Sequence, residues 1–146
     1  MKTPMGMTGF VVLGFVLMAS TVKAQPADFK LVVNESNRMS SLTPAEATQF
    51  FLKKKTTWPD GGVVAPVDQV ESSPVRRAFS KAVLRKDVEA VKGYWQTQIF
   101  SGRAVPAPEK ASDVAVLAFV DATPGAIGYV SAGAPIRRGV KEIKIR

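Results

Sequence analysis

The chain has 146 residues, with 20 lysines and arginines against 12 aspartates and glutamates, which gives a formal net charge of +8. It contains no histidine and no cysteine. Imidazole and thiolate metal sites, disulfides, and nucleophile sites built on histidine or cysteine are therefore excluded. With 46% hydrophobic and 22% charged residues, the composition is that of one globular domain. A basic surface attracts anions, from small oxyanions to anionic surfaces.

The first 24 residues have the pattern of a secretory signal peptide. Lys2 supplies a positive start, residues 10–19 are apolar, and Val22 and Ala24 occupy the −3 and −1 positions of a cleavage site. We therefore expect cleavage near Ala24 and a periplasmic or secreted protein of residues 25–146. The alternative is that the uncharged residues 3–22 are kept as a single membrane anchor. Export argues against nucleic acid as a partner.

In the first half of the exported part, a strand and a helix are followed by a second strand. Residues 29–34 predict a strand, and a polar loop runs from there to residue 41. Thr43 as N-cap, Pro44 at the first helical position and Glu46 in a capping box predict a helix to about residue 53. A turn is expected at residues 58–62 and a strand at residues 63–67, where Pro66 indicates a sheet edge or a strand end.

The second half predicts three helices and then two strands. Ser73 and Pro74 start a helix, and Asp87 caps the next one. The apolar residues expected on these two helices are Val75, Phe79, Ala82, Val83, Val88, Val91, Tyr94, Trp95 and Ile99. A loop at residues 101–110 leads to a helix at residues 112–122 and to strands at residues 126–130 and 140–145. The fold class is therefore α/β, with a small mixed β-sheet flanked by helices.

Five local patterns occur in a fixed order in this part of the chain. They are residues 31–34 with Asn37, residues 42–51, residues 58–61, residues 73–79, and Pro-Gly-Ala-Ile-Gly-Tyr-Val at residues 124–130. Together they resemble the phosphate-binding periplasmic proteins of ABC transporters, which have the type 2 periplasmic-binding fold. The resemblance covers nearly all of residues 25–146 but only part of the family's chain. It therefore implies a single periplasmic-binding-protein-like lobe, the one that presents a serine-led helix N-terminus to the anion.

The resemblance implies an oxyanion site at the start of the helix that follows Ser73. The family offers Ser-Gly-Thr, then a phenylalanine four residues after the threonine, and an arginine shortly before the serine. Ser73 and Phe79 match this pattern. Pro74 has no N–H to donate, Val75 has no hydroxyl, and Gln69 is neutral where the family has arginine. Three polar ligands of the family are therefore missing or weakened.

Neighbouring polar residues are the candidates to replace the missing ligands. The expected anion-binding set is Ser72, Ser73, Arg76, Arg77 and Asn34. Hydroxyls and guanidinium groups beside a helix N-terminus suit an oxyanion, and Asn34 stands at the carboxyl end of the first strand, where ligands often bind in α/β sheets. In the alternative interpretation, Ser73 only caps the helix and both arginines are solvated.

Two functions from different classes follow. The first is an exported solute-binding module that takes phosphate or a related oxyanion weakly, linked to an ABC permease. The second is a non-enzymatic interaction protein that keeps the lobe but has lost tight ligand binding, with an envelope protein or a second copy of the chain on its exposed face. Nothing in the spacing of Asp60, Asp68 and Glu71 favours acid/base catalysis. We therefore expect no enzymatic activity, no metal and no cofactor.

Overall fold

A five-stranded sheet forms the centre of the molecule in the computed structural model, which describes residues 28–146. The signal peptide expected over residues 1–24 lies outside the described residues. The strands run in the order β2-β7-β1-β6-β3. They are β1 (Phe29–Asn34), β2 (Ser41–Leu42), β3 (Ala65–Pro66), β6 (Ala126–Ser131) and β7 (Val140–Ile145).

The sheet is mixed, as predicted. Strand β1 runs antiparallel to both β6 and β7, with Leu31 opposite Tyr129 on one side and Ile143 on the other. The short strands β2 and β3 run parallel to β7 and β6 and form the two edges. Two further strands, β4 (Asp68–Gln69) and β5 (Glu109–Lys110), form a separate parallel pair.

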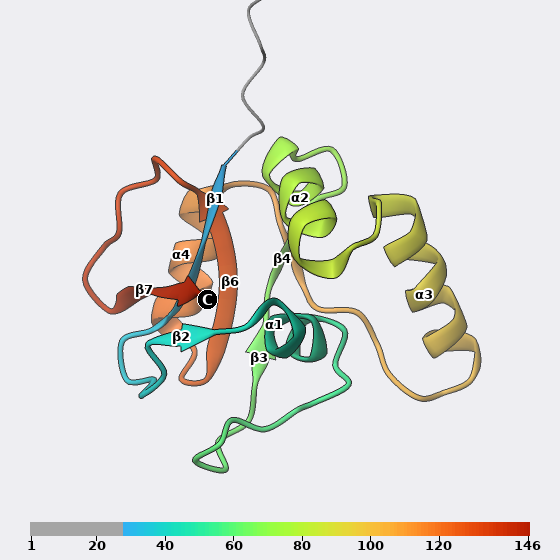
Figure 1. Cartoon of the computed structure of the whole chain (residues 1–146), viewed down its shortest axis with the longest axis horizontal. Coiled ribbons are helices and arrows are strands. Elements are labelled where there is room, and N and C mark those ends of the chain that lie inside the picture. Colours follow the sequence, from blue (N-terminus) through green and yellow to red (C-terminus); the bar gives the residue numbers. More distant parts are fainter. Residues whose placement is uncertain (1–27) are drawn as a thin grey trace, which may run out of the picture.

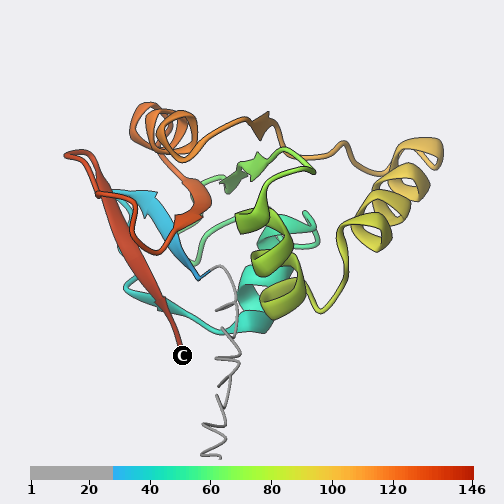
Figure 2. The ribbon, with the colours of Figure 1, turned by 90° about the horizontal axis from the view of Figure 1, so that it is seen from above.

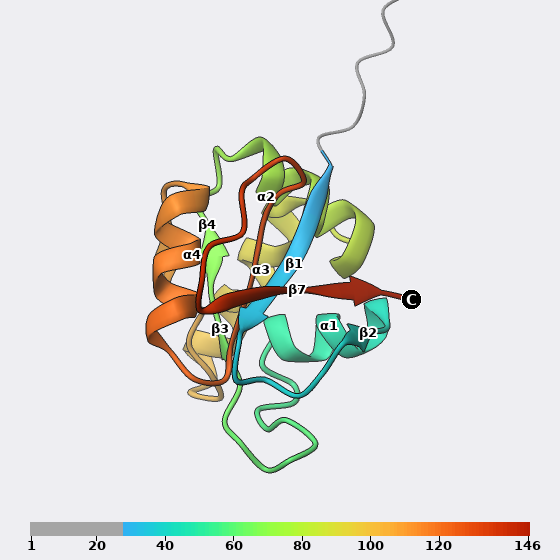
Figure 3. The ribbon, with the colours of Figure 1, turned by 90° about the vertical axis from the view of Figure 1, so that its left-hand side faces the viewer.

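Successive side chains of a strand point to opposite faces of the sheet, and apolar side chains are buried on both faces. On β1, Leu31 and Val33 pack into one core cluster and Val32 packs into the other. The first cluster lies under α1 (Pro44–Phe51), α2 (Pro74–Phe79) and the π-helical η1 (Ser80–Leu84), and the second lies under α4 (Asp113–Ala122). Figure 3 shows α4 on one side of the sheet and α1 and α2 on the other, and Figure 2 shows the same layers from above.

Helix α3 (Val88–Phe100) lies at the outer end of the molecule, beyond α2 and η1 (Figure 1). Only Val91 and Trp95 of its 13 residues are fully buried. Its aromatic residues attach it to the rest of the fold: Trp95 belongs to the core cluster, and the Tyr94 hydroxyl donates to the Leu52 carbonyl oxygen at 2.7 Å. Ile99, expected on the apolar face, is 51% exposed, so that expectation was wrong.

The predicted helix starts are confirmed. Thr43 forms a capping box with Glu46, and Ser73, Asp87 and Ser112 cap α2, α3 and α4 through their side chains. Of the helices in the described part, none is long and apolar enough to cross a membrane.

Some boundaries differ from the sequence prediction. Helix α1 ends at Phe51 because Lys53 takes a left-handed backbone conformation, with φ of 52°. The strand expected at residues 63–67 pairs with β6 only at Ala65–Pro66, since Val63 is 71% exposed and bridges to Thr57 instead. The two-residue strands β2, β4 and β5 were not predicted, because they depend on partners far along the chain.

Candidate functional site

The start of α2, where the sequence predicts an anion, is occupied by groups of the chain itself. Ser73 caps the helix: its hydroxyl oxygen accepts from the Arg76 N–H at 3.3 Å. The same hydroxyl donates to the Gln69 Oε1 atom at 2.7 Å. Pro74 follows and has no N–H. The serine hydroxyl expected to hold an oxyanion is therefore already bonded on both sides.

Arg76 points into the molecule. Arg76 is only 4% exposed. Its Nη1 donates to the Gln69 carbonyl oxygen at 2.6 Å and to Glu109 Oε1 at 2.5 Å. Its Nη2 lies 3.6 Å from Asp68 Oδ2. Burial opposes the charge, but Asp68 and Glu109 together raise the pKa of Arg76 above its ordinary value. The guanidinium is thus charged and held by two carboxylates of the chain.

Tyr129 forms the buried side of this cluster. Its hydroxyl donates to Asp68 Oδ1 and accepts from the Gln69 N–H at 3.2 Å, and its ring stacks on Phe79 with the ring centres 4.0 Å apart. Burial raises the pKa of the Asp68 carboxyl, while Arg76 and Tyr129 act in the opposite direction. Burial and the Asp68 carboxylate raise the pKa of the Tyr129 hydroxyl, which therefore remains a donor.

Gln69 joins the cluster to α4. Its Nε2 donates to Asp113 Oδ1 at 2.9 Å and to the Tyr129 carbonyl oxygen at 3.1 Å. The cluster thus contains one guanidinium, that of Arg76, and the carboxylates of Asp68, Glu109 and Asp113. Every buried side-chain N or O atom in the described part has a hydrogen-bond partner. An incoming anion would add to an excess of negative charge among these side chains.

Ser72 and Arg77 remain at the surface of the same helix start. Both are exposed, and Arg77 Nη1 donates to the Ser72 carbonyl oxygen at 2.9 Å. The guanidinium of Arg77 therefore lies beside the first turn of α2 and is accessible to solvent. These two residues are the members of the expected set that the structure leaves open.

Asn34 lies apart from the other expected ligands. It is buried, and its Nδ2 donates to the carbonyl oxygens of Val120 and Asp121 at 2.9 and 3.0 Å, at the end of α4. Gln69, the partner of Ser73, bonds to the first residue of the same ten-residue helix. A helix of that length spans about 15 Å. The structure therefore brings Ser72, Ser73, Arg76 and Arg77 together and leaves Asn34 at the opposite end of α4, where it donates to carbonyl oxygens of the last helical turn.

The remaining motifs have structural roles or line a shallow cavity. Trp58 is buried, and its indole N–H donates to the Gly125 carbonyl oxygen at 2.9 Å. A depression of about 250 Å³ lies beside it. It is lined by Ser36, Asn37, Trp58, Asp60, Gly62, Val63, Pro124 and Gly125. Among residues 28–146 there is no group of three or more acidic side chains placed to hold a metal ion.

The sequence contains no sign that Glu109 and Asp113 come to lie beside Arg76 and Gln69. Glu109 lies in a segment expected to be an irregular loop, and Asp113 was expected only as part of a helix. They reach the cluster through the pairing of β5 with β4 and through the packing of α4. Tyr129 belongs to the recognised 124–130 segment, so a family pattern was the one available signal for it.

Comparison with solved structures shows the class of fold. An ABC-type phosphate transport receptor from Vibrio cholerae superposes with a TM-score of 0.63 and 21% identity over 80% of this chain and 45% of its own. A Clostridium perfringens protein provisionally assigned as a phosphate ABC transporter substrate-binding protein, with bound phosphate, gives a TM-score of 0.65 at 19% identity over 80% of this chain and 44% of its own. The PstS protein of Borrelia burgdorferi gives 0.64 at 13% identity over 81% of this chain and 47% of its own.

These similarities confirm a periplasmic-binding-protein-like lobe as the fold of this chain. The chain spans less than half the length of the three proteins, as a single lobe would. No protein-family model and no curated protein matches the sequence. At identities of 13–21%, the likeness extends to the fold and not to the ligand.

Proposed function

We propose that this chain is an exported, non-enzymatic interaction module, which keeps the lobe of a solute-binding protein without its tight oxyanion site. The observation that carries the proposal is the state of Arg76: the guanidinium is buried and hydrogen-bonded to Glu109, with Asp68 beside it. A carboxylate of the chain occupies the place that an anionic ligand would need. Binding phosphate there would require displacing the partly exposed Glu109 carboxylate from the buried guanidinium.

The lobe fold supports the second half of the proposal. This chain covers less than half the length of the solved structures that it resembles, and the face at which those proteins join their remaining part is the surface that we propose for a partner. A partner from the cell envelope, an ABC permease or a second copy of the chain are the candidates for that surface. The signal-peptide pattern of residues 1–24 is the reason to place the protein in the periplasm or outside the cell.

Calorimetric titration with inorganic phosphate at low ionic strength tests the proposal. We expect no saturable heat for the wild-type protein at micromolar to low millimolar phosphate. As a matched pair, Glu109→Gln removes the competing charge from Arg76, and Glu71→Gln removes an exposed carboxylate outside the cluster. Weak phosphate binding that appears with Glu109→Gln and not with Glu71→Gln would agree with occupation by Glu109. Micromolar binding by the wild-type protein would overturn the proposal.

A second candidate function is weak oxyanion binding at the open part of the same helix start. It is favoured by the exposed guanidinium of Arg77, which is positioned by the Ser72 carbonyl oxygen. Such a site would be solvent-screened, so only millimolar affinity is expected. Amide chemical shifts around Ser72 should then change with phosphate and lose that response in Arg77→Ala. An unchanged spectrum would exclude this candidate.

A further inference from the structure

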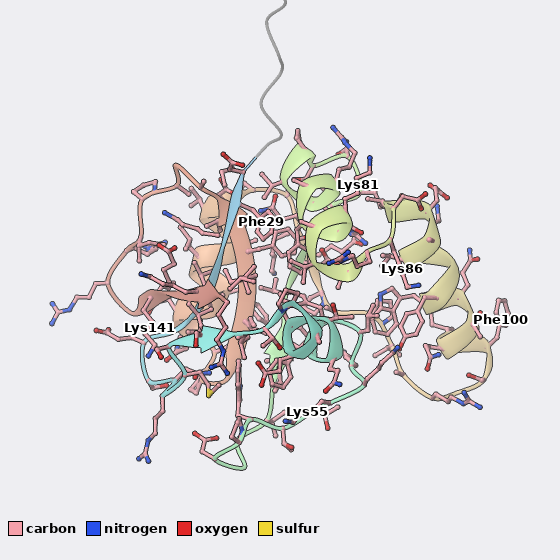
Figure 4. All side chains as sticks on the ribbon, viewed as in Figure 1. Phe29, Lys55, Lys81, Lys86, Phe100 and Lys141 are labelled. Carbon is pink, nitrogen blue, oxygen red and sulfur yellow. The ribbon has the colours of Figure 1, made fainter. Side chains whose placement is uncertain are left out.

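The outward face of α3 combines an exposed aromatic ring with a glycine. Glu89, Gly93, Gln96 and Phe100 follow each other at helical spacing, so they share the side of α3 opposite Val91 and Trp95. Phe100 is 90% exposed, and Figure 4 shows its side chain on the outer side of the helix. A Cβ built on Gly93 would have no neighbour within 4 Å. Packing within the chain therefore explains neither residue, although a glycine inside a helix costs about 1 kcal/mol.

The geometry points to a second copy of this chain as the partner of that face, through an antiparallel pair of α3 helices. With a two-fold axis near Gln96, Phe100 of one copy lies opposite Gly93 of the other, and the missing side chain of the glycine leaves room for the ring. Because of the two-fold symmetry, the contact between Gly93 and Phe100 forms twice. The exposed ring of each copy then fills the space beside the glycine of the other copy.

The charges of α3 agree with pairing of two identical surfaces. A two-fold contact brings residues near the axis close to their own counterparts, where a charge would repel itself. Residues 96–102 carry no charge, although the whole chain has a formal net charge of +8. Away from the axis, Glu89 of one copy comes near Arg103 of the other, and both side chains are exposed. The helix ends are thus complementary in charge, and the centre is neutral.

This inference rests on the proposed function, since a lobe that works through a partner needs such a surface. The contact is small, one helix per copy, with Ile99 and Val105 exposed beside it at 51% and 66%. Association in the micromolar to millimolar range is therefore expected. Sedimentation equilibrium of the exported part over a wide concentration range measures it directly.

Three variants separate the contact from effects on folding. Phe100→Ala should weaken dimerisation about tenfold or more. Gly93→Gln should do the same by filling the space opposite the ring, while it raises the free energy of unfolding through better helix propensity. Val114→Ala is the matched control, since Val114 is 68% exposed on α4 and should leave the association unchanged. A monomer at every concentration, or association that Phe100→Ala and Gly93→Gln leave intact, would overturn the proposal.

Two further measurements test the geometry of the pair. Because the chain has no cysteine, Gln96→Cys introduces a single thiol near the proposed axis. Mild oxidation should cross-link it into a covalent dimer faster than Val114→Cys.

Glu89→Arg and Arg103→Glu should each weaken the dimer, and the double variant should restore it. Absence of both the cross-link and the charge effect would exclude the antiparallel arrangement. The phosphate titration is independent of these results, so a failed dimer and a failed interaction module can be told apart.

Discussion

At the scale of single residues, Arg76 shows how position in the fold changes the meaning of a residue type. Beside the start of a surface helix, an arginine would be a natural anion ligand. Here the guanidinium is buried among Asp68, Glu109 and Tyr129, and Arg77, its neighbour in sequence, is exposed. A buried charge is stable only when it is paired and fully hydrogen-bonded. Arg76 is therefore part of the structural core, and Arg77 is the residue open to ligands.

The two adjacent arginines should differ sharply in their effect on stability. Arg76→Ala leaves Asp68 without its ion-pair partner and opens a cavity, so we expect a loss of about 3 kcal/mol in the free energy of unfolding. Arg77→Ala removes an exposed side chain and should change it by less than about 0.5 kcal/mol. Urea denaturation of both variants and the wild type measures the difference. Similar losses in the two variants would show that Arg76 is not a buried structural group.

At the scale of the element, local signals decide where the helices begin. In α1 the Thr43 hydroxyl oxygen accepts from the Glu46 N–H at 3.2 Å, and Glu46 Oε2 accepts from the Thr43 N–H at 2.8 Å. The Thr43 hydroxyl also donates to Glu46 Oε2 at 3.0 Å, and the hydrogen bonds from the Thr43 N–H and hydroxyl to this carboxylate lower the pKa of Glu46 below its ordinary value of 4.5. A carboxyl with a lowered pKa in the folded state stabilises the fold above that ordinary value, and the contribution is lost as the pH falls through the lowered one.

Removal of this cap should cost stability in a pH-dependent way. Thr43→Ala should lower the free energy of unfolding by about 1 kcal/mol near neutral pH. Part of that difference should disappear at acid pH, as the pH falls through the lowered pKa of Glu46 and the carboxyl becomes protonated. Thermal or urea unfolding at the two pH values measures it, with Thr56→Ala as a control at an exposed position. A difference that grows at low pH would contradict the role given to Glu46.

At the scale of the whole molecule, the closeness of α4 to the sheet depends on Gly128 of β6. A Cβ at this position would lie 2.7 Å from Val67 Cγ1 and 2.8 Å from Val116 Cγ1. Real Cβ atoms do not come that close, and β-branched valines have few alternative conformations. The glycine therefore sets the distance between the α4 layer and the sheet.

An added methyl group at this position should separate the layers. We expect Gly128→Ala to lower the free energy of unfolding by about 1–3 kcal/mol through overpacking. Gly133→Ala is the control, because a Cβ there would have no neighbour within 4 Å. Chemical denaturation of the two variants measures the contrast. Equal stabilities would mean that the layers can separate without cost.

By itself, the sequence determined the helix starts, the long strands and the mixed sheet between helices. Caps at Thr43 and Ser73 and the apolar alternation of residues 29–34 act over a few residues, so they can be read locally. Only the tertiary structure decided the state of the candidate site. Glu109 and Asp113 lie more than 30 residues from Arg76 and reach the cluster through strand pairing and helix packing. Whether an arginine faces an anion or a carboxylate of its own chain depends on such distant contacts, which local patterns do not encode.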